Sequence, residues 1–243
     1  MKYPVALTEG ILIKREKRFL VHVELPGGEK VIAHTNNTGT MLSCNTPGSK
    51  CWLSPANNPK RKLKWTYEIV ESDGVKVGIN TSVPNKLAEE AILNGAITEL
   101  QGYNNLRREV KYGKNSRIDI LLESDNSRCW VEVKNVTLTD GNGTALFPDA
   151  VTARGLKHLH ELENMVEQGD RAVMLYIVQR SDAVQFATAD EIDPKYAAGL
   201  KQAMKNGVEV LCYRAEVLVD GVEIVEPLEA LCQPSPTSIK TTP

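Results

Sequence analysis

Two acidic residues and one lysine in the stretch RIDILLESDNSRCWVEVK, residues 117 to 134, have the types and spacing of a metal-dependent hydrolytic site. Asp119 and Glu132 offer carboxylate oxygens, which are the hard ligands that Mg²⁺ and Mn²⁺ prefer. Lys134 follows Glu132 by two residues, so in a strand it shares that face and could hold a negative charge or orient a water. Together the three side chains predict metal-assisted hydrolysis of phosphodiesters.

The same stretch has the pattern of two strands joined by a turn at residues 124 to 127. In that register Asp119 lies directly opposite Glu132, and facing like charges destabilise a sheet by roughly 0.2 to 1 kcal/mol. A bound dication would compensate for this repulsion. The alternative is a solvated square of salt bridges, because Arg117 and Lys134 also fall opposite each other. Alternation predicts one apolar hairpin face, made of Ile118, Ile120, Leu122, Cys129, Val131 and Val133.

The elements around this hairpin predict an α/β chain with two domains and a tail. Residues 5 to about 80 carry short alternating runs such as RFLVHVEL between turn signals, which is typical of a small β-barrel. Helices are predicted at about 84–95, 150–168 and 194–205, with strands between them, so we expect a central mixed sheet flanked by helices. We therefore divide the chain into residues 1–82, 83–230 and a polar, proline-rich tail at 231–243 that we expect to be disordered.

Composition narrows the class of protein. A chain of 243 residues suits two modest domains, and its formal net charge of -2 gives no global basic field, so any nucleic-acid binding must come from local patches. We expect a cytoplasmic protein with no membrane contact, because there is no signal-like segment and no apolar run long enough to span a bilayer. The five cysteines form no CxxC pair, which favours reduced thiols over disulfides or zinc. The oligomeric state stays open.

An aspartate followed by ExK across a hairpin, between two helices, resembles the PD-(D/E)xK nuclease superfamily and its restriction-endonuclease-like fold. More specifically, the chain resembles the sugar fermentation stimulation protein A family over nearly its whole length. The matching stretches are KRFL at 17–20, NTGTM at 37–41, NPKRKLKWTYE at 58–68, NKLAEEAI at 85–92, EVKYGKNSRIDILL at 109–122, VEVKNVTL at 131–138, FPDAVTARGLKHLHEL at 147–162 and GVEVLCYRAE at 207–216.

This resemblance implies an OB-like barrel followed by a nuclease-like domain. It also implies binding of DNA, expected to be double-stranded, without strong sequence preference, and a regulatory link to sugar metabolism, especially of maltose. In the superfamily pattern Asp119 and Glu132 would hold the metal, Lys134 would assist the water, and Glu90 on the preceding helix could add a carboxylate. Ile118 stands where the superfamily has a proline. Family membership does not establish cleavage, so the alternative is a non-catalytic DNA-binding regulator on the same scaffold.

Basic residues supply candidate DNA contacts. One run has aromatic residues, Trp65 and Tyr67, close behind it, and on a barrel such a run can track phosphates while the aromatic rings stack on bases; it consists of Lys60, Arg61, Lys62 and Lys64. The alternative is a set of surface lysines around a core tryptophan. A second patch, equally open, consists of Lys14, Arg15, Lys17 and Arg18.

Polar residues near the expected cleft add further candidates. Arg154 and His158 are four apart on the predicted helix after the ExK strand, so they project from one face and could contact DNA. Gln179 could line the same cleft or cap a strand. We interpret Asn36, Asn37 and Gly39 as a tight turn rather than a functional loop.

Overall fold

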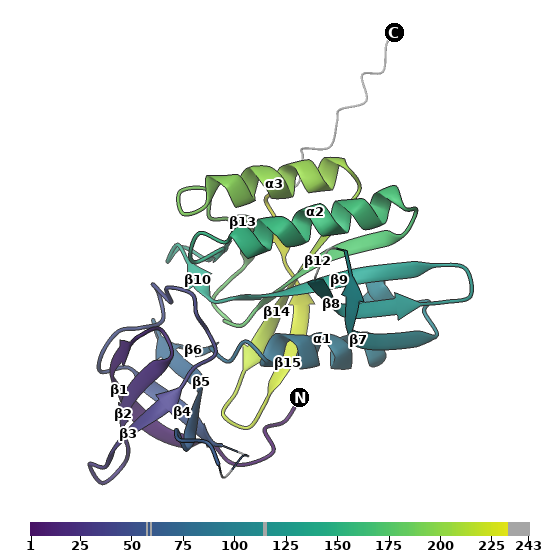
Figure 1. Ribbon diagram of the computed structural model, residues 1–243. Coiled ribbons are helices and arrows are strands. Elements are labelled where there is room, and N and C mark those ends of the chain that lie inside the picture. Colours follow the sequence, from purple (N-terminus) through teal and green to yellow (C-terminus); the bar gives the residue numbers. More distant parts are fainter. Residues whose placement is uncertain (57, 59, 114–115, 233–243) are drawn as a thin grey trace.

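The chain folds into a β-barrel packed against a mixed sheet that carries helices on both faces (Figure 1). The structure is a computed structural model, and it describes residues 1–56, 58, 60–113 and 116–232. The tail expected at 231–243 lies outside the described residues from 233 onward. None of the described helices is long and apolar enough to cross a membrane. All five cysteines are free and buried, as the missing CxxC pair led us to expect.

The barrel is built from the first strands of the chain. They are β1 (Thr8–Glu16), β2 (Leu20–Glu24), β3 (Lys30–His34), β4 (Lys50–Pro55), β5 (Trp65–Ser72) and β6 (Val75–Gly78). The strand order is β3-β2-β1-β4-β5-β6, and an additional parallel pairing of β3 with β5 closes the first five strands into a barrel. Alternation places Leu12, Val21 and Val23 inside, where they are at most 1% exposed. The predicted barrel is therefore confirmed.

The second half of the chain forms a six-stranded mixed sheet in the order β15-β14-β12-β9-β8-β7. Its strands are β7 (Asn105–Tyr112), β8 (Ser116–Glu123), β9 (Arg128–Val136), β12 (Arg171–Val178), β14 (Glu209–Val217) and β15 (Val222–Pro227). Strand β12 runs parallel to β9 and β14, and the other pairs are antiparallel. β12 is almost wholly buried, because helices cover both faces of the sheet at this strand.

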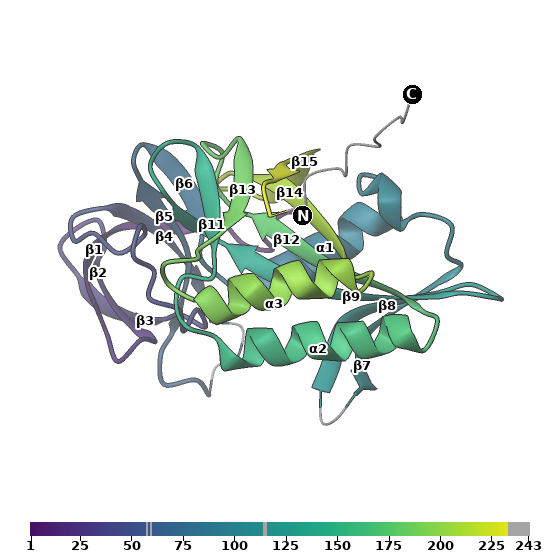
Figure 2. The same cartoon turned by 90° about the horizontal axis from the view of Figure 1, so that it is seen from above.

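Three α-helices cover the sheet within the described part of the chain. They are α1 (Val83–Leu93), α2 (Ala153–Glu167) and α3 (Pro194–Lys205). Helices α2 and α3 lie side by side on one face, and α1 lies on the other (Figures 1 and 2). The side-chain hydroxyl of Thr152 accepts a hydrogen bond from the N–H of Gly155, and Asp193 caps α3 in the same way. The caps set where these two helices begin, and the structure confirms all three predicted helices.

The hairpin of β8 and β9 has the predicted register over four pairs, from Glu123–Arg128 to Ile120–Val131. Its faces differ from our expectation. Most of the predicted apolar face packs against α1, but Ile118 lies in the cluster on the opposite side, beneath α2, together with Leu121 and Trp130. The second face of the hairpin is therefore buried rather than solvated, because the parallel connection from β9 to β12 passes through α2.

A small second sheet and a 3₁₀ turn were not predicted. The sheet consists of β10 (Leu138–Thr139), β11 (Thr144–Phe147), β13 (Gln185–Thr188) and β16 (Glu229–Ala230), and the turn, η1 (Thr98–Leu100), follows α1. The first residues of the chain also leave the barrel. Lys2 forms an isolated bridge with Gly221, and Tyr3 and Leu7 pack against the core beneath α1. The N-terminal segment therefore ties the barrel to the β14–β15 hairpin.

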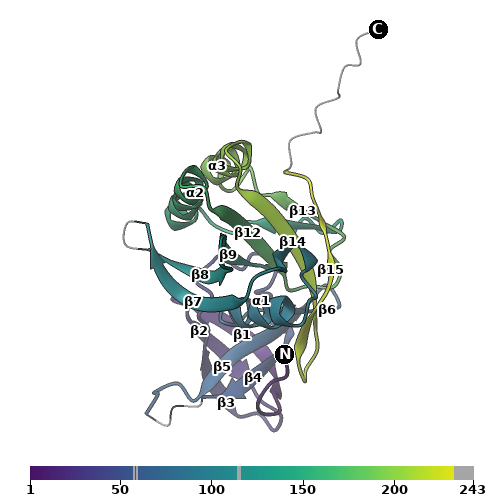
Figure 3. The same ribbon diagram turned by 90° about the vertical axis from the view of Figure 1, so that its right-hand side faces the viewer.

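Two residues that follow β12, Gln179 and Arg180, join the barrel to the sheet through polar contacts. Figures 1 and 3 show the barrel on the same side of the sheet as α1. The N–H of Gly78 donates to the carbonyl of Gln179 over 3.0 Å, and the Gln179 amide donates back to the carbonyl of Gly78 over 3.1 Å. Gln179 is fully buried, so it acts as a joint between the two halves rather than as an exposed strand cap.

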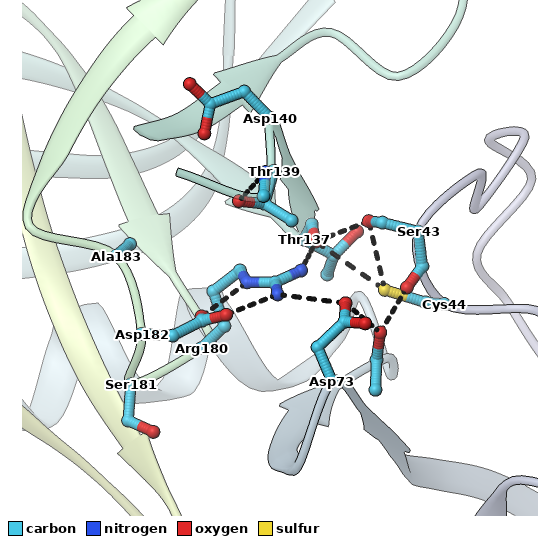
Figure 4. Close-up of polar contacts among 12 residues, drawn as sticks. Ser43, Cys44, Asp73, Thr137, Thr139, Asp140, Arg180, Ser181, Asp182 and Ala183 are labelled. Atoms are coloured by element: carbon cyan, nitrogen blue, oxygen red, sulfur yellow. Dashed lines mark hydrogen bonds and ion pairs between the residues drawn. The ribbon is translucent and has the colours of Figure 1, made fainter. Parts of the chain in front are cut away.

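Arg180, the next residue, is a fully buried cation at this joint (Figure 4). Its guanidinium donates to both carboxylate oxygens of Asp182, each over 2.6 Å, and to the carbonyl of Thr137 over 2.9 Å. Asp73, in the β5–β6 turn of the barrel, lies 4.0 Å from the same group. The hydroxyl of Ser43 donates to the Thr137 carbonyl as well. These contacts hold the barrel against the end of β9.

Candidate active site

Asp119, Glu132 and Lys134 line one cavity of about 360 Å³ between the barrel and the sheet. Asp119 comes from β8, and the other two residues come from β9. The start of α1, the first two turns of α2, the β10–β11 segment and barrel residues 36–39 also line it. The hairpin register brings the two carboxylates near the same point, although the backbone pairs of β8 and β9 end at Ile120–Val131.

Glu132 is the most deeply buried member of the site, with 2% of its surface exposed. Its Oε1 accepts a hydrogen bond from Lys134 Nζ over 2.6 Å and is also in contact with Nδ1 of His158. Its Oε2 is buried and has no hydrogen-bond partner among the described residues. Burial by itself would raise the pKa of Glu132, but the Lys134 ammonium and His158 outweigh it and lower the pKa. The carboxylate therefore stays charged, with one oxygen left for a ligand.

Asp119 is held by two hydrogen bonds. Its Oδ1 accepts from the side-chain amide of Asn85 over 2.6 Å, and its Oδ2 accepts from the N–H of Val133 over 2.8 Å. Burial and the charge of Glu132 raise the pKa of Asp119 to about 6, against the opposing effect of these hydrogen bonds and Lys134. The backbone pairing of β7 with β8 skips Asp119 and the residue opposite it, Glu109. Glu109 has a positive φ of 54°. The sheet is thus irregular where the carboxylate enters the cavity.

His158 supports Glu132 from α2. Nε of Arg154 donates to Nε2 of His158 over 3.3 Å, and Nδ1 of His158 faces Glu132 Oε1 and lies 3.3 Å from Lys134 Nζ. His158 is 4% exposed. It lines the cavity, so a contact between His158 and DNA stays a prediction. Arg154 is exposed and lines the cavity, so a contact between Arg154 and DNA stays a prediction.

Glu90 lies away from this cavity. Its carboxylate accepts a hydrogen bond from the amino group of Met1 over 2.8 Å, and it lines a different pocket beside the β14–β15 turn. Asn85 is the α1 residue that reaches Asp119. Five residues correspond to about 1.4 helical turns, so the two side chains leave α1 in different directions. We therefore correct the expectation that Glu90 adds a carboxylate to the site.

Several polar residues of the cavity were missed or undervalued by sequence reasoning. Asn85 and Asp149 were not singled out at all. Asn135 follows the ExK lysine directly, and its Oδ1 accepts from the amide of Gln179 over 2.8 Å. Its Nδ2 is buried without a hydrogen-bond partner among the described residues. Its place beside Lys134 was the only signal in the sequence that could have found it.

The barrel loop at residues 36–41 is a wall of the cavity rather than only a turn. Arg15 lies under it and donates to the carbonyls of Asn37, Gly39 and Thr40, over 2.8 Å, 2.9 Å and 3.2 Å. From the other side, the carboxylate of Asp149 accepts the N–H of Met41 over 2.9 Å. Arg15 is therefore committed to the loop, which takes it out of the second basic patch.

The basic run lies in the β4–β5 loop. Lys60, Lys62 and Lys64 are exposed. Arg61 is half-buried, because its guanidinium donates to the hydroxyl of Thr66 and the carbonyl of Trp65. Tyr67 is 1% exposed and belongs to the barrel core, so it cannot offer the stacking face that we expected of it. Trp65 is half-buried, packs on the barrel core and keeps part of its surface in water.

The model of the "Sugar fermentation stimulation protein RE domain" matches residues 82–221, and that of the "SfsA N-terminal OB domain" matches residues 13–79. This chain belongs to the sugar fermentation stimulation protein family. The resemblance found in the sequence is thereby confirmed, as are the OB-like barrel and the restriction-endonuclease-like fold of the second half.

Individual members of the sugar fermentation stimulation protein family are similar over almost the whole chain. A homologue from Geobacter metallireducens is 53% identical over 95% of this chain and 100% of its own length. One from Maricaulis maris is 55% identical over 94% of this chain and 97% of its own. The solved structure of Pyrococcus furiosus SfsA in complex with Ca²⁺ is 27% identical, with a TM-score of 0.87, and covers 95% of this chain and 97% of that one.

Proposed function

We propose that this protein binds DNA and hydrolyses its phosphodiester bonds with a divalent cation, Mg²⁺ or Mn²⁺, held by Asp119 and Glu132. The observation that carries the proposal is the buried Glu132 Oε2, which has no hydrogen-bond partner among the described residues and lines the same cavity as Asp119. A buried carboxylate oxygen without a partner is costly, and a cation would remove that cost. The relative from Pyrococcus furiosus was solved in complex with Ca²⁺, which also seeks oxygen ligands.

The donor set fits such an ion. Within the described ranges, no three His, Cys, Asp or Glu side chains come together as a metal-binding group. An ion at this site would therefore take the two carboxylates and complete its shell with water and substrate oxygens, as Mg²⁺ commonly does. When bound, it would supply Lewis-acid activation of the phosphate and of a water.

The remaining side chains would position these groups. Asn85 and the N–H of Val133 keep Asp119 oriented, and His158 keeps Glu132 oriented. Lys134 Nζ, which is 2.6 Å from Glu132 Oε1, can hold a water or neutralise charge that develops on the phosphate. Arg154 lies at the edge of the cavity, where it can hold a neighbouring phosphate.

The second candidate function is a DNA-binding regulator of sugar metabolism that does not cut. The exposed lysines of the β4–β5 loop favour it, because they lie outside the catalytic cavity and could bind phosphates without it. The family name supplies the link to sugar metabolism.

One experiment separates the two functions. Purified protein is incubated at low salt with supercoiled, linear and single-stranded DNA in Mg²⁺, Mn²⁺ or EDTA. Cleavage that requires the metal supports the hydrolase, whereas DNA that is retarded but intact in every condition supports the regulator. If DNA is neither retarded nor cut, both proposals fail.

Metal affinity is expected to fall below pH 6. Protons compete with the ion for Asp119, whose pKa is raised to about 6, so above this pH the carboxylate is charged and available. Below it, the apparent affinity should drop by about tenfold per pH unit, because one proton must leave for each ion bound. Calorimetric titration with Ca²⁺ between pH 5 and pH 8 measures this. An affinity that does not change over the range would contradict it.

Replacing Lys60 and Lys62 together with alanine is expected to weaken DNA binding and reduce its salt dependence. For each DNA phosphate that the variant no longer neutralises, the slope of log K against log salt should become shallower by about 0.9. Arg61 is left in place because its guanidinium holds the loop. The matched control replaces Lys195 and Lys205, which are exposed on α3, on the face of the sheet away from the barrel. If both double variants have the same slope of log K against log salt, DNA binds to another surface of the protein.

A further inference from the structure

We infer that the strand reaching Asp119 and Glu132 is a single polynucleotide strand, and that an intact duplex is excluded from this cavity. The inference rests on the proposed function and names its substrate class. The resemblance led us to expect duplex DNA as the partner, and that stays a prediction for the outer surface of the protein. The inference concerns only the strand that enters the cavity.

The first observation is the depth and size of the cavity. The side chains of Glu132 and Lys134 are 3% and 14% exposed, so a phosphate must enter the protein to reach them. The volume of about 360 Å³ is at the low end for a small-molecule site. The phosphates of a duplex lie on its outside, but its two strands move together, so a duplex can bring a phosphate to these side chains only if the cavity admits the width of both strands.

The second observation is that the barrel-side wall is fixed. Arg15 holds three carbonyls of the 36–41 loop from within the barrel, and Asp149 holds the N–H of Met41 from the other side. Asp149 also packs so closely on Gly39 that a β-carbon there would collide with its carboxylate. The hydroxyl of Thr40 donates to the carbonyl of Asp149. Widening the cavity for a duplex would break these contacts.

The third observation is that two further cavities share lining residues with this one. A cavity of about 750 Å³ shares Asp119, Arg154 and His158 with it and is lined by Lys111, Arg117 and Lys157. Another cavity, of about 430 Å³, shares Asn36 with it and is lined by Arg61 and Lys86. Each neighbouring cavity thus offers cations, beside one further carboxylate, Glu109 in the first and Glu68 in the second. A single strand that leaves the central cavity can place its phosphates against these cations.

The side-chain amide of Asn135 offers a hydrogen-bond donor to a strand in the central cavity, the one that holds Asp119 and Glu132. Its Nδ2 is buried, lines the central cavity and has no acceptor among the described residues. Its Oδ1 is held by Gln179, which fixes the orientation of the amide. An oxygen of a phosphate or a base would satisfy it.

The test compares one labelled oligonucleotide as a single strand, as a blunt duplex and as a duplex with an overhang, together with a single-stranded RNA of the same sequence. Fluorescence anisotropy measures the part of the binding that depends on Ca²⁺, and cleavage is mapped in Mn²⁺. We expect the single strand to exceed the blunt duplex by about tenfold or more in both measurements, and cuts in the third substrate to fall in its overhang. The RNA arm shows whether the 2′-hydroxyl is accepted.

The variant Asp149→Ala tests the wall. It removes the acceptor of Met41, so the ratio of single-strand to duplex cleavage should fall, whereas Asp125→Ala, at the exposed tip of the hairpin, should leave it unchanged. Wild-type protein that binds and cuts the blunt duplex as well as the single strand would overturn the inference and leave the hydrolase standing. A ratio unchanged by Asp149→Ala would overturn the role of the wall. If no substrate is bound or cut, the proposed function itself is wrong.

Discussion

The variant Asp119→Asn is expected to lose metal-dependent DNA cleavage by about 1,000-fold or more. Asparagine keeps the size of the side chain but removes one of the two charges that would hold the cation. Losing about 4 kcal/mol of stabilisation of the charged transition state corresponds to a factor of this size. The measurement is the rate of cleavage in Mn²⁺, beside the rise in melting temperature that Ca²⁺ produces. Both responses should disappear together.

The stability of the metal-free protein distinguishes a functional Asp119 from a structural one. Its pKa is raised to about 6 in the folded chain from an ordinary value of 3.8, so the folded state binds the proton more tightly. The ionised form therefore costs stability, and this cost sets in as the pH rises from about 4 and is complete above pH 6. For a mostly buried group it is of the order of 1 to 3 kcal/mol at neutral pH.

Asp119→Asn removes this cost but leaves the N–H of Val133 or the amide of Asn85 with a poorer partner. The metal-free variant should therefore melt no lower than the wild type at pH 8, although it is inactive. Asp125→Asn, at the exposed tip of the same hairpin, should match the wild type in activity, melting temperature and response to Ca²⁺. A clear loss of stability in metal-free Asp119→Asn would instead indicate that this carboxylate serves mainly the fold.

Asp182→Ala is expected to destabilise the protein by about 3 to 5 kcal/mol, the largest effect on folding that we predict. The guanidinium of Arg180 is fully buried, and without Asp182 it keeps, among the described residues, only the carbonyl of Thr137 and Asp73 at 4.0 Å. A buried charge without its partner costs far more than the ion pair contributes. Urea unfolding, followed by fluorescence and circular dichroism, measures the change in the free energy of unfolding.

The control for this prediction is an exposed pair between Lys201 on α3 and Asp190, which precedes that helix. Lys201 and Asp190 lie 3.2 Å apart, and about half of each side chain is exposed, so Asp190→Ala should cost less than about 1 kcal/mol. The double variant Arg180→Met, Asp182→Ala should recover part of the loss, because it removes the stranded charge. If Asp182→Ala proves as mild as Asp190→Ala, water must reach Arg180 and the joint is looser than the contacts indicate.

Much of the architecture could be read from the sequence because it depends on local patterns. The helices at 83–93, 153–167 and 194–205 follow from apolar periodicity, from Pro84 and Pro194 in their first turns, and from the capping residue before two of them. The hairpin register was correct because turn length determines which residues face each other. Glu132 and Lys134 share a face for the same kind of reason, since strand side chains alternate.

The failures share one physical cause, which is that contacts between distant segments leave no periodic signal. Asn85, rather than Glu90, meets Asp119, because the way α1 packs on the sheet decides which of its faces reaches β8. Arg15 resembled a DNA contact by composition, yet its donors are taken by the 36–41 loop of the same barrel. The hairpin is buried on both faces because α1 covers one of them and α2, which comes after β9 in the chain, covers the other.

The sequence by itself determined the barrel, the mixed sheet with its three helices, and the presence of two acidic residues and a lysine on neighbouring strands. Local stereochemistry and hydrophobic patterning are enough for that, since each acts over a few residues. Only the tertiary structure decided that these side chains lie in a narrow cavity, because its second wall comes from residues 36–39, roughly eighty to one hundred positions away in the chain. It also decided that Glu132 is buried with one oxygen unsatisfied, since burial depends on how α2 and the barrel pack around β9.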